Sequence, residues 1–318
     1  MSALDWNVKT GLLLSASTDR GVIVWQESAD IKGMKPQLAV IKETKSNVDA
    51  SWNQLGNKFC VGASSGNVFV GMFDEGQNFW VAHPISGKKP LHSASVVSVR
   101  FDPLSGRAVA SASVDGKCYI TSCYTENTDL SATQGPFGKV TTWGETLFSF
   151  SVIGWVNFVA WSPDATVLAY GTHDCELNFA DVSSPSGGKA DKQMLLYKGN
   201  PFLCGTLLNS TTFIGCGYDK VPYLFKKSGS SWTFVKHLDE GINKEKQTQI
   251  GKGSFEQSNL MFKRLESQSS QQLQEDVIMK EMNTKHVNYI NYLKTLTNGK
   301  IATSDVNGNI FYWDVAGL

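Results

Sequence analysis

The segment VSVRFDPLSGRAVASASVDGKCYI, residues 97–120, contains the pattern that decides the fold. An alternating apolar run ends at Phe101, a turn follows, and a run of small residues extends over 108–113. Asp115 and Gly116 then mark a tight turn before a third apolar run. Alternation with a period of two residues, bounded by turn residues, predicts antiparallel β-strands.

The same pattern recurs along the chain in six copies. Each copy has a short polar residue at the turn between its second and third strands: Asp19, Ser65, Asp115, Asp174, Asp219 and Asn307. Such side chains suit the position because they hydrogen-bond their own backbone in a tight turn. Six residues after this turn, Trp25 and Trp313 fill an aromatic position. The WD40 repeat has this arrangement, a four-stranded blade repeated every ~40–45 residues.

The predicted fold class is therefore all-β, a WD40 β-propeller that forms a single domain over residues 1–318. The residues at the turns are interpreted as structural, because they stabilise the blades. Ser17 and Ser113 stand two residues before a turn aspartate. We expect them to supply the hydroxyl of the hydrogen-bond network within a blade.

The closure of the ring has two interpretations. A propeller usually pairs its N-terminal strand into the last blade, so that no sheet edge is left open. Here the first recognisable strand, near Leu4, already belongs to the inner part of a blade, and the sixth repeat stops close to the end of the sequence. Either six blades close imperfectly, or the chain lacks one N-terminal blade of a seven-bladed ring. We favour the second.

The last spacing between turns, from Asp219 to Asn307, is about two repeats long. It indicates either a missed blade or an insertion. Residues 241–286 contain no strand alternation and no Gly/Asp turn, so we interpret them as an insertion that protrudes from the propeller.

Part of this insertion has a helical pattern. A capping-box sequence at 254–257 predicts a helix start, and Phe255, Phe262 and Leu265 then fall on about one face, with Met261 beside them. A helix of this length is marginal alone, so its apolar face needs something to pack on. It either folds back on the propeller rim or lies in a groove of another protein.

Composition and motifs exclude several classes of function. The chain has 29 Lys plus Arg and 29 Asp plus Glu, so nothing predicts a general attraction to nucleic acid or to an anionic membrane. The six cysteines are scattered, and we find no spacing typical of a zinc site or of a hydrolase or phosphate-binding motif. His173 and Asp174 are the most suggestive catalytic pair, but the aspartate stands at a repeat turn. We predict no enzyme, no cofactor, no metal and, without a signal peptide or membrane span, a cytoplasmic protein.

Several segments match one family beyond the general repeat. They are residues 73–75, 78–81, 88–93, 154–156, 161–163 and 217–219, and residues 262–266 within the insertion. In this ordered set the chain resembles the WD-repeat subunit of the actin-related protein 2/3 complex. The resemblance covers essentially the whole chain and includes the place of the insertion before the last repeat.

The resemblance implies a seven-bladed propeller in a seven-subunit assembly that binds an actin filament and, when stimulated by nucleation-promoting factors, starts a branch. It implies a non-catalytic subunit of the actin cytoskeleton, whose partners are the other subunits, the actin filament and those factors. The insertion would contact a partner through Phe262 and Leu265 first, then Phe255, Met261 and Arg264. The alternative is a WD-repeat scaffold of another complex, in trafficking, ubiquitin ligation or chromatin.

Overall fold

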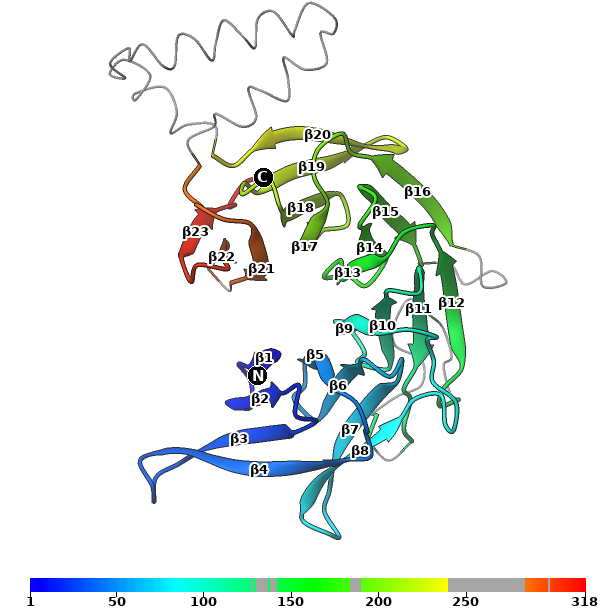
Figure 1. The fold of residues 1–318 in the computed structure, drawn as a ribbon, viewed down its shortest axis with the longest axis vertical. Helices are drawn as coiled ribbons and strands as arrows, with labels where there is room; N and C mark the ends of the chain where they lie inside the picture. The colour runs from blue at the N-terminus through cyan, green and yellow to red at the C-terminus, as the bar shows by residue number, and fades with distance from the viewer. Residues whose placement is uncertain (127, 130–136, 138–141, 184–189, 240–283, 297) are drawn as a thin grey trace, which may run out of the picture.

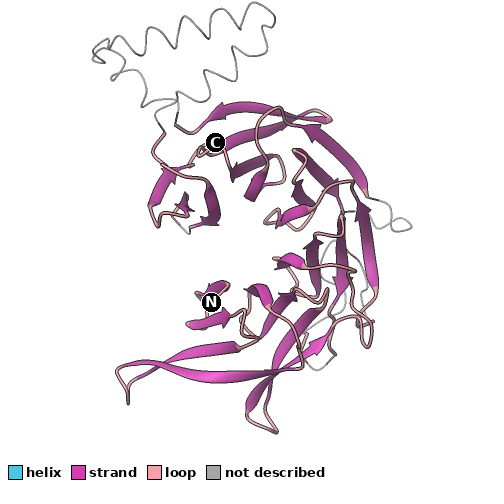
Figure 2. Cartoon of the chain, viewed as in Figure 1, coloured by secondary structure: helices cyan, strands magenta, loops and turns pink. Residues whose placement is uncertain are grey.

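The fold is known from a computed structural model, which describes residues 1–318 apart from 127, 130–136, 138–141, 184–189, 240–283 and 297. The described residues form strands and turns, and none of them is helical (Figure 2). No described helix is therefore long and apolar enough to cross a membrane. The strands are grouped into six blades around a central channel (Figure 1), which confirms the predicted all-β propeller.

Each blade starts with an inner strand at the channel, and the following strands pair outward in antiparallel order. The strands of blades 1 to 3 are β1 (Ala3–Asn7), β2 (Leu12–Ala16), β3 (Val22–Ser28), β4 (Gly33–Ile41), β5 (Asn47–Trp52), β6 (Lys58–Ala63), β7 (Val68–Asp74), β8 (Phe79–Pro84), β9 (Val96–Phe101), β10 (Ala108–Ser113), β11 (Lys117–Ser122) and β12 (Thr146–Ser151). Those of blades 4 to 6 are β13 (Val156–Trp161), β14 (Val167–Thr172), β15 (Glu176–Asp181), β16 (Asp191–Leu196), β17 (Phe202–Asn209), β18 (Thr212–Gly217), β19 (Tyr223–Ser228), β20 (Ser231–His237), β21 (Ile290–Thr295), β22 (Lys300–Asp305) and β23 (Ile310–Asp314). Each of the six sequence repeats thus corresponds to one blade.

The second strands β6, β10, β14 and β18 explain the runs of small residues in the sequence. Every residue in these four strands is buried, because each strand is covered by a neighbouring blade on both faces. Space there is tight: a Cβ atom added to Gly171 of β14 would lie 2.3 Å from the ring of Phe158 on β13. Strands covered on both faces read as continuous apolar or small runs, without polar alternation.

Apolar clusters fill the spaces between successive blades. The described core divides into five clusters, one at each junction from blades 1 and 2 to blades 5 and 6. Between blades 4 and 5, for example, Phe179 stacks on Trp232 with ring centroids 3.8 Å apart. Burial of such side chains contributes roughly 1.5–3 kcal/mol each, so these junctions hold the ring together.

The ring is open on the side between blade 6 and blade 1 (Figure 1). In the described part of the chain, blade 6 has the three strands β21, β22 and β23, and no apolar cluster joins it to blade 1. The Lys294 Nζ atom on β21 lies 2.7 Å from Asp5 Oδ1 on β1. A polar contact therefore connects the two sides of the opening, and the choice between six and seven blades stays a prediction.

Blades 1 and 2 are joined at the rim in a way that the repeat pattern does not predict. Residues Ala39–Ile41 of β4 pair in parallel with Trp80–Ala82 of β8, which merges the two blades into one eight-stranded sheet. The hairpin of β3 and β4 is long and protrudes from the disc (Figure 1). Its side chains Ile31 and Leu38 are exposed, so it is an additional projecting arm.

Candidate functional site

The turn residue Asp115 of blade 3 links this blade to the loop that enters it. Its carboxylate accepts hydrogen bonds from the Ser93 and Lys117 backbone N–H groups, at 2.9 and 3.0 Å, and faces His92 Nδ1 at 3.2 Å. Burial alone would raise the pKa of Asp115, but the Ser93 hydrogen bond and the facing His92 hold the pKa below its usual value. The carboxylate therefore acts as a fixed acceptor at the blade entrance.

His92, Asp115 and Ser111 have the connectivity of a hydrolase triad. The Ser111 hydroxyl lies 2.8 Å from His92 Nε2, while Nδ1 of the same ring faces the carboxylate. Ser111 has no exposed surface, however, and burial lowers the pKa of His92, which favours the neutral ring. A nucleophile must reach its substrate, so this arrangement stabilises the blade and offers no reactive atom.

Blade 6 has the complete form of this network. His286 Nδ1 lies 3.0 Å from Asp305 Oδ2, and His286 Nε2 lies 2.7 Å from the Thr303 hydroxyl. The same hydroxyl accepts the Trp313 indole N–H at 2.8 Å. Burial alone would raise the pKa of Asp305, but hydrogen bonds from His286 and Asn309 lower it to about 2. The polar atoms of the network are thus paired although they lie in the core.

The expectation about the network hydroxyls needs correction, and blade 6 has a carboxylate that the sequence pattern did not indicate. The carboxylate in blade 6 comes from Asp305, while Asn307 at the expected turn position donates its backbone N–H to it at 3.0 Å. The hydroxyls of Ser17 and Ser113 accept N–H groups within their own turns. The hydroxyls of the networks are those of Ser15, Ser111 and Thr303, four residues before the turn position. Ser17 lies just beyond the end of β2 and Ser113 is the last residue of β10, so their hydroxyls serve the turn that follows each strand.

The other turn residues use different partners. Ser65 donates to the Glu43 carboxylate at 2.6 Å, and Asp219 accepts from the Tyr223 hydroxyl at 3.0 Å. Asp19 accepts the N–H of Gly21 at 2.9 Å, and Asp174 accepts the Thr172 hydroxyl. All four sites therefore fix a turn or a loop entrance, and none of them brings together a set of groups suited to catalysis.

The central channel is the large cavity of the described structure, with a volume of about 960 Å³. Inner strands of all six blades line it. Its wall contains two ion pairs, Asp5 with Lys294 at 2.7 Å and Asp49 with Arg100 at 2.5 Å. Opposite charges balance each other here, so the wall has no excess of one sign that would select an anion or a cation.

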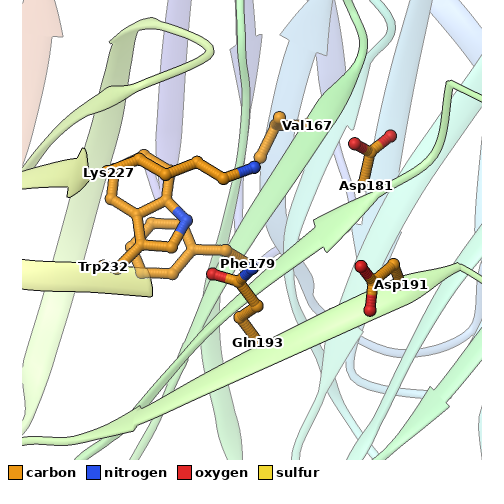
Figure 3. A pocket seen from close by; sticks show the side chains of 7 residues that line it. All are labelled: Val167, Phe179, Asp181, Asp191, Gln193, Lys227 and Trp232. Atoms are coloured by element: carbon orange, nitrogen blue, oxygen red, sulfur yellow. The ribbon is translucent and has the colours of Figure 1, made fainter. Parts of the chain in front are cut away.

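A second pocket lies at the rim between blades 4 and 5 (Figure 3). Asp181 and Asp191 are cross-strand partners, and Lys227 and Gln193 lie nearby beside the Phe179–Trp232 stack. Its volume of about 10 Å³ suits a single water molecule and no larger ligand. Within the described residues, no group of three or more His, Cys, Asp or Glu side chains could hold a metal ion.

Aromatic rings, three of them exposed and one half-buried, form a row on the face that contains the turn residues. The row consists of Trp155, His173, Tyr218 and Tyr289, with successive ring centroids 5.2, 6.4 and 5.3 Å apart. It crosses blades 4, 5 and 6. Sequence reasoning missed it because its members come from separate repeats, and only the order of the blades brings them together. A solvent-exposed aromatic surface of this kind is suited to protein contacts.

The predicted partner-binding residues Phe255, Met261, Phe262, Arg264 and Leu265 lie outside the described residues. The predicted boundary of the insertion at residue 286 is too late. His286 is fully buried in the network of blade 6, and the Lys285 backbone N–H donates to Asp239 Oδ2 at 3.1 Å. Residues 284–286 therefore belong to the propeller, since their polar groups are fixed there by hydrogen bonds.

Comparison with known proteins finds several relatives that are similar to this chain over most of its length. No family model matches the chain. Subunit 1A of the actin-related protein 2/3 complex from Arabidopsis thaliana is 26% identical over 327 residues, which cover all of this chain and 83% of the relative. Subunit 1A-B from Xenopus laevis is 27% identical with the same coverage, and subunit 1 from Schizosaccharomyces pombe is 25% identical over 84% of this chain and 70% of the relative. The chain is therefore similar over its whole length to subunit 1 of the actin-related protein 2/3 complex, as its sequence predicts.

Proposed function

We propose that this protein is the propeller subunit of an actin-related protein 2/3 complex and supports the nucleation of branched actin filaments through protein contacts. The similarity of the whole chain to subunit 1 of that complex in plants, a frog and yeasts is the observation that carries this proposal. Its partners are the other subunits of the complex, the actin filament and nucleation-promoting factors. Its place is the cytoplasm, at the actin cytoskeleton.

The role is structural and regulatory, without catalysis. The two histidine networks are buried, and Ser111 and His286 have no exposed surface from which chemistry could proceed. A disc with filled junctions keeps its surfaces in fixed relative positions, which is what a scaffold requires. Fixed surfaces lower the entropy that is lost when several partners bind at once.

The insertion is the proposed contact with actin or a neighbouring subunit. Residue 239 and residue 284 lie close together, because the Asp239 carboxylate accepts the N–H of Lys285. Both ends of the intervening segment therefore leave the propeller at one point, at the entrance of blade 6. A segment anchored in this way can present its apolar residues Phe262 and Leu265 to a partner.

Affinity purification tests the assignment. A tagged copy of the full chain, expressed in its own cells, should recover two actin-related proteins together with small helical subunits in equal amounts. The recovered complex should accelerate pyrene-actin polymerisation when a nucleation-promoting factor is added. Recovery of cullin, vesicle-coat or histone partners instead would replace the proposal with a scaffold of another complex.

A further inference from the structure

The aromatic row is defined as Trp155, His173, Tyr218 and Tyr289. It continues over three blades, and each ring lies near the next one. It is also open to solvent: Trp155 is 54% exposed and Tyr218 is 38% exposed. Ile153 precedes the row and is 95% exposed. Large apolar side chains gathered on one face of a soluble protein mark an interaction site more often than scattered ones do.

The Trp155 end of the row has an aspartate close to it. The Asp174 carboxylate packs against the backbone of Gly154, where an added Cβ atom would lie 2.5 Å from Oδ1. The exposed Asp174 thus follows His173 of the row and packs against the residue that precedes Trp155. The faces of aromatic rings also attract cations, because their quadrupole places negative charge above and below the ring.

Two further charged residues follow Tyr218, on the next blade. Asp219 follows Tyr218 and is already paired with Tyr223 and with Asn200. The amine of Lys220 is exposed, but it stands on the Tyr218 side, one blade away from Trp155. The row therefore has an aspartate near its end at blade 4 and a more neutral, aromatic continuation over blades 5 and 6.

We propose that this face binds an extended segment of a partner protein that contains an arginine next to apolar residues. The guanidinium lies flat on the free face of Trp155 and pairs with Asp174, while the apolar neighbours lie on Tyr218 and Tyr289. Arginine fits better than lysine because its planar group stacks on a ring and presents a fork of donors to a carboxylate. The inference deepens the proposed function, since it takes the chain to be a protein-binding subunit.

Charge complementarity also argues against other occupants. An acidic segment or a nucleic acid strand would bring negative charge against Asp174 and against the ring faces. Bases of a single strand can stack on aromatic rows, but such sites combine the rings with a positive groove. The Trp155 end has the opposite charge, so a basic segment is the occupant that the surface favours.

A random dodecapeptide library displayed on phage tests the proposal, with the full chain as bait and its Trp155→Ala variant for counterselection. The selected peptides should contain an arginine beside apolar residues. Fluorescence anisotropy with one such labelled peptide should show a Kd raised about tenfold by Trp155→Ala, and a similar loss when the peptide arginine becomes alanine. Trp6→Ala is the matched control, because Trp6 is 48% exposed and stands at the far end of its strand, next to the first hairpin turn of β1.

Asp174→Asn should weaken the peptide to a similar degree and reduce the salt dependence of binding. If this variant does not fold, as circular dichroism would reveal, Trp155→Ala and the peptide variant carry the test alone. The proposal would be overturned if the selected peptides had the same affinity for the Trp6→Ala and Trp155→Ala variants of the protein. A selection dominated by acidic peptides would overturn it as well. Recovery of actin-related proteins by the tagged chain is a separate result, so failure here and failure of the proposed function are distinguishable.

Discussion

Lys294 and Asp5 form an ion pair of 2.7 Å that connects the inner strand of blade 6 with the inner strand of blade 1. The Asp5 carboxylate also accepts the Trp52 backbone N–H at 2.8 Å and the Ser51 hydroxyl at 3.3 Å. One side chain thus holds three blades at the channel. The two halves of this arrangement differ in burial, since the Lys294 side chain is 48% exposed and that of Asp5 is 12% exposed.

This difference predicts unequal effects of two substitutions. Lys294→Met should lower the free energy of unfolding by less than about 1 kcal/mol, because an exposed ion pair contributes little. Asp5→Ala should cost about 1–3 kcal/mol, because it leaves the N–H of Trp52 without its partner. Urea unfolding followed by tryptophan fluorescence measures both. Equal losses would mean that the ion pair, and not the bond to blade 2, is the main contribution of Asp5.

The network of blade 6 predicts a second effect on stability. Asp305→Ala removes the acceptor of the buried His286 ring and of two backbone N–H groups in the exposed turn that follows. We expect a loss of about 1–3 kcal/mol in unfolding free energy, because the buried His286 ring loses its hydrogen-bond partner. Asn307→Ala is the matched control at the turn position. It should cost under about 1 kcal/mol, because its side chain accepts an exposed hydrogen bond from Asn288.

The same carboxylate predicts a pH dependence. Asp305 has its pKa lowered to about 2 in the folded protein, below the usual value of 3.8. The unfolded state therefore binds a proton first, so the stabilisation is complete above about pH 4 and is lost as the pH falls towards 2. Thermal unfolding of wild type and Asp305→Asn between pH 2 and 6 measures this. The curves should converge at low pH, and parallel curves would contradict the assignment.

The sequence predicts the blades well because each blade is a local pattern. The alternation around Phe101, the small run of β10 and the turn at Asp115 lie within one repeat, so their spacing is visible along the chain. Contacts between repeats are not visible in this way. The parallel pairing of β4 with β8, the Trp155–His173–Tyr218–Tyr289 row and the pair of Asp5 with Lys294 depend on how blades are placed side by side. In blade 6 the carboxylate that faces His286 comes from Asp305, the last residue of β22, and not from the turn position.

Lys58 illustrates a contact that no pattern in the sequence indicates. Its fully buried ammonium donates to the Asp129 carboxylate at 2.5 Å and to the Cys123 carbonyl at 3.0 Å. Asp129→Ala should cost about 3–5 kcal/mol, because it leaves a buried cation without its counterion. The double variant with Lys58→Met should regain most of this loss, because an apolar side chain of similar length needs no partner. Denaturant unfolding of Asp129→Ala, Lys58→Met and the double variant gives the coupling energy, and additive losses would show that the pair is not coupled.

The proposed insertion contact gives the last prediction. Phe262→Asp with Leu265→Asp places two charges on the predicted apolar face, which should prevent its burial against a partner. The complex should still assemble, because the described apolar clusters that join the blades are built from residues of the propeller strands and turns, but its branching rate in a pyrene-actin assay should fall several-fold. Ser269→Asp with Ser270→Asp adds the same charge to the Ser/Gln-rich part of the insertion and should leave the rate unchanged. If the two double variants nucleate branches equally well, the insertion acts through other residues or makes no contact in nucleation.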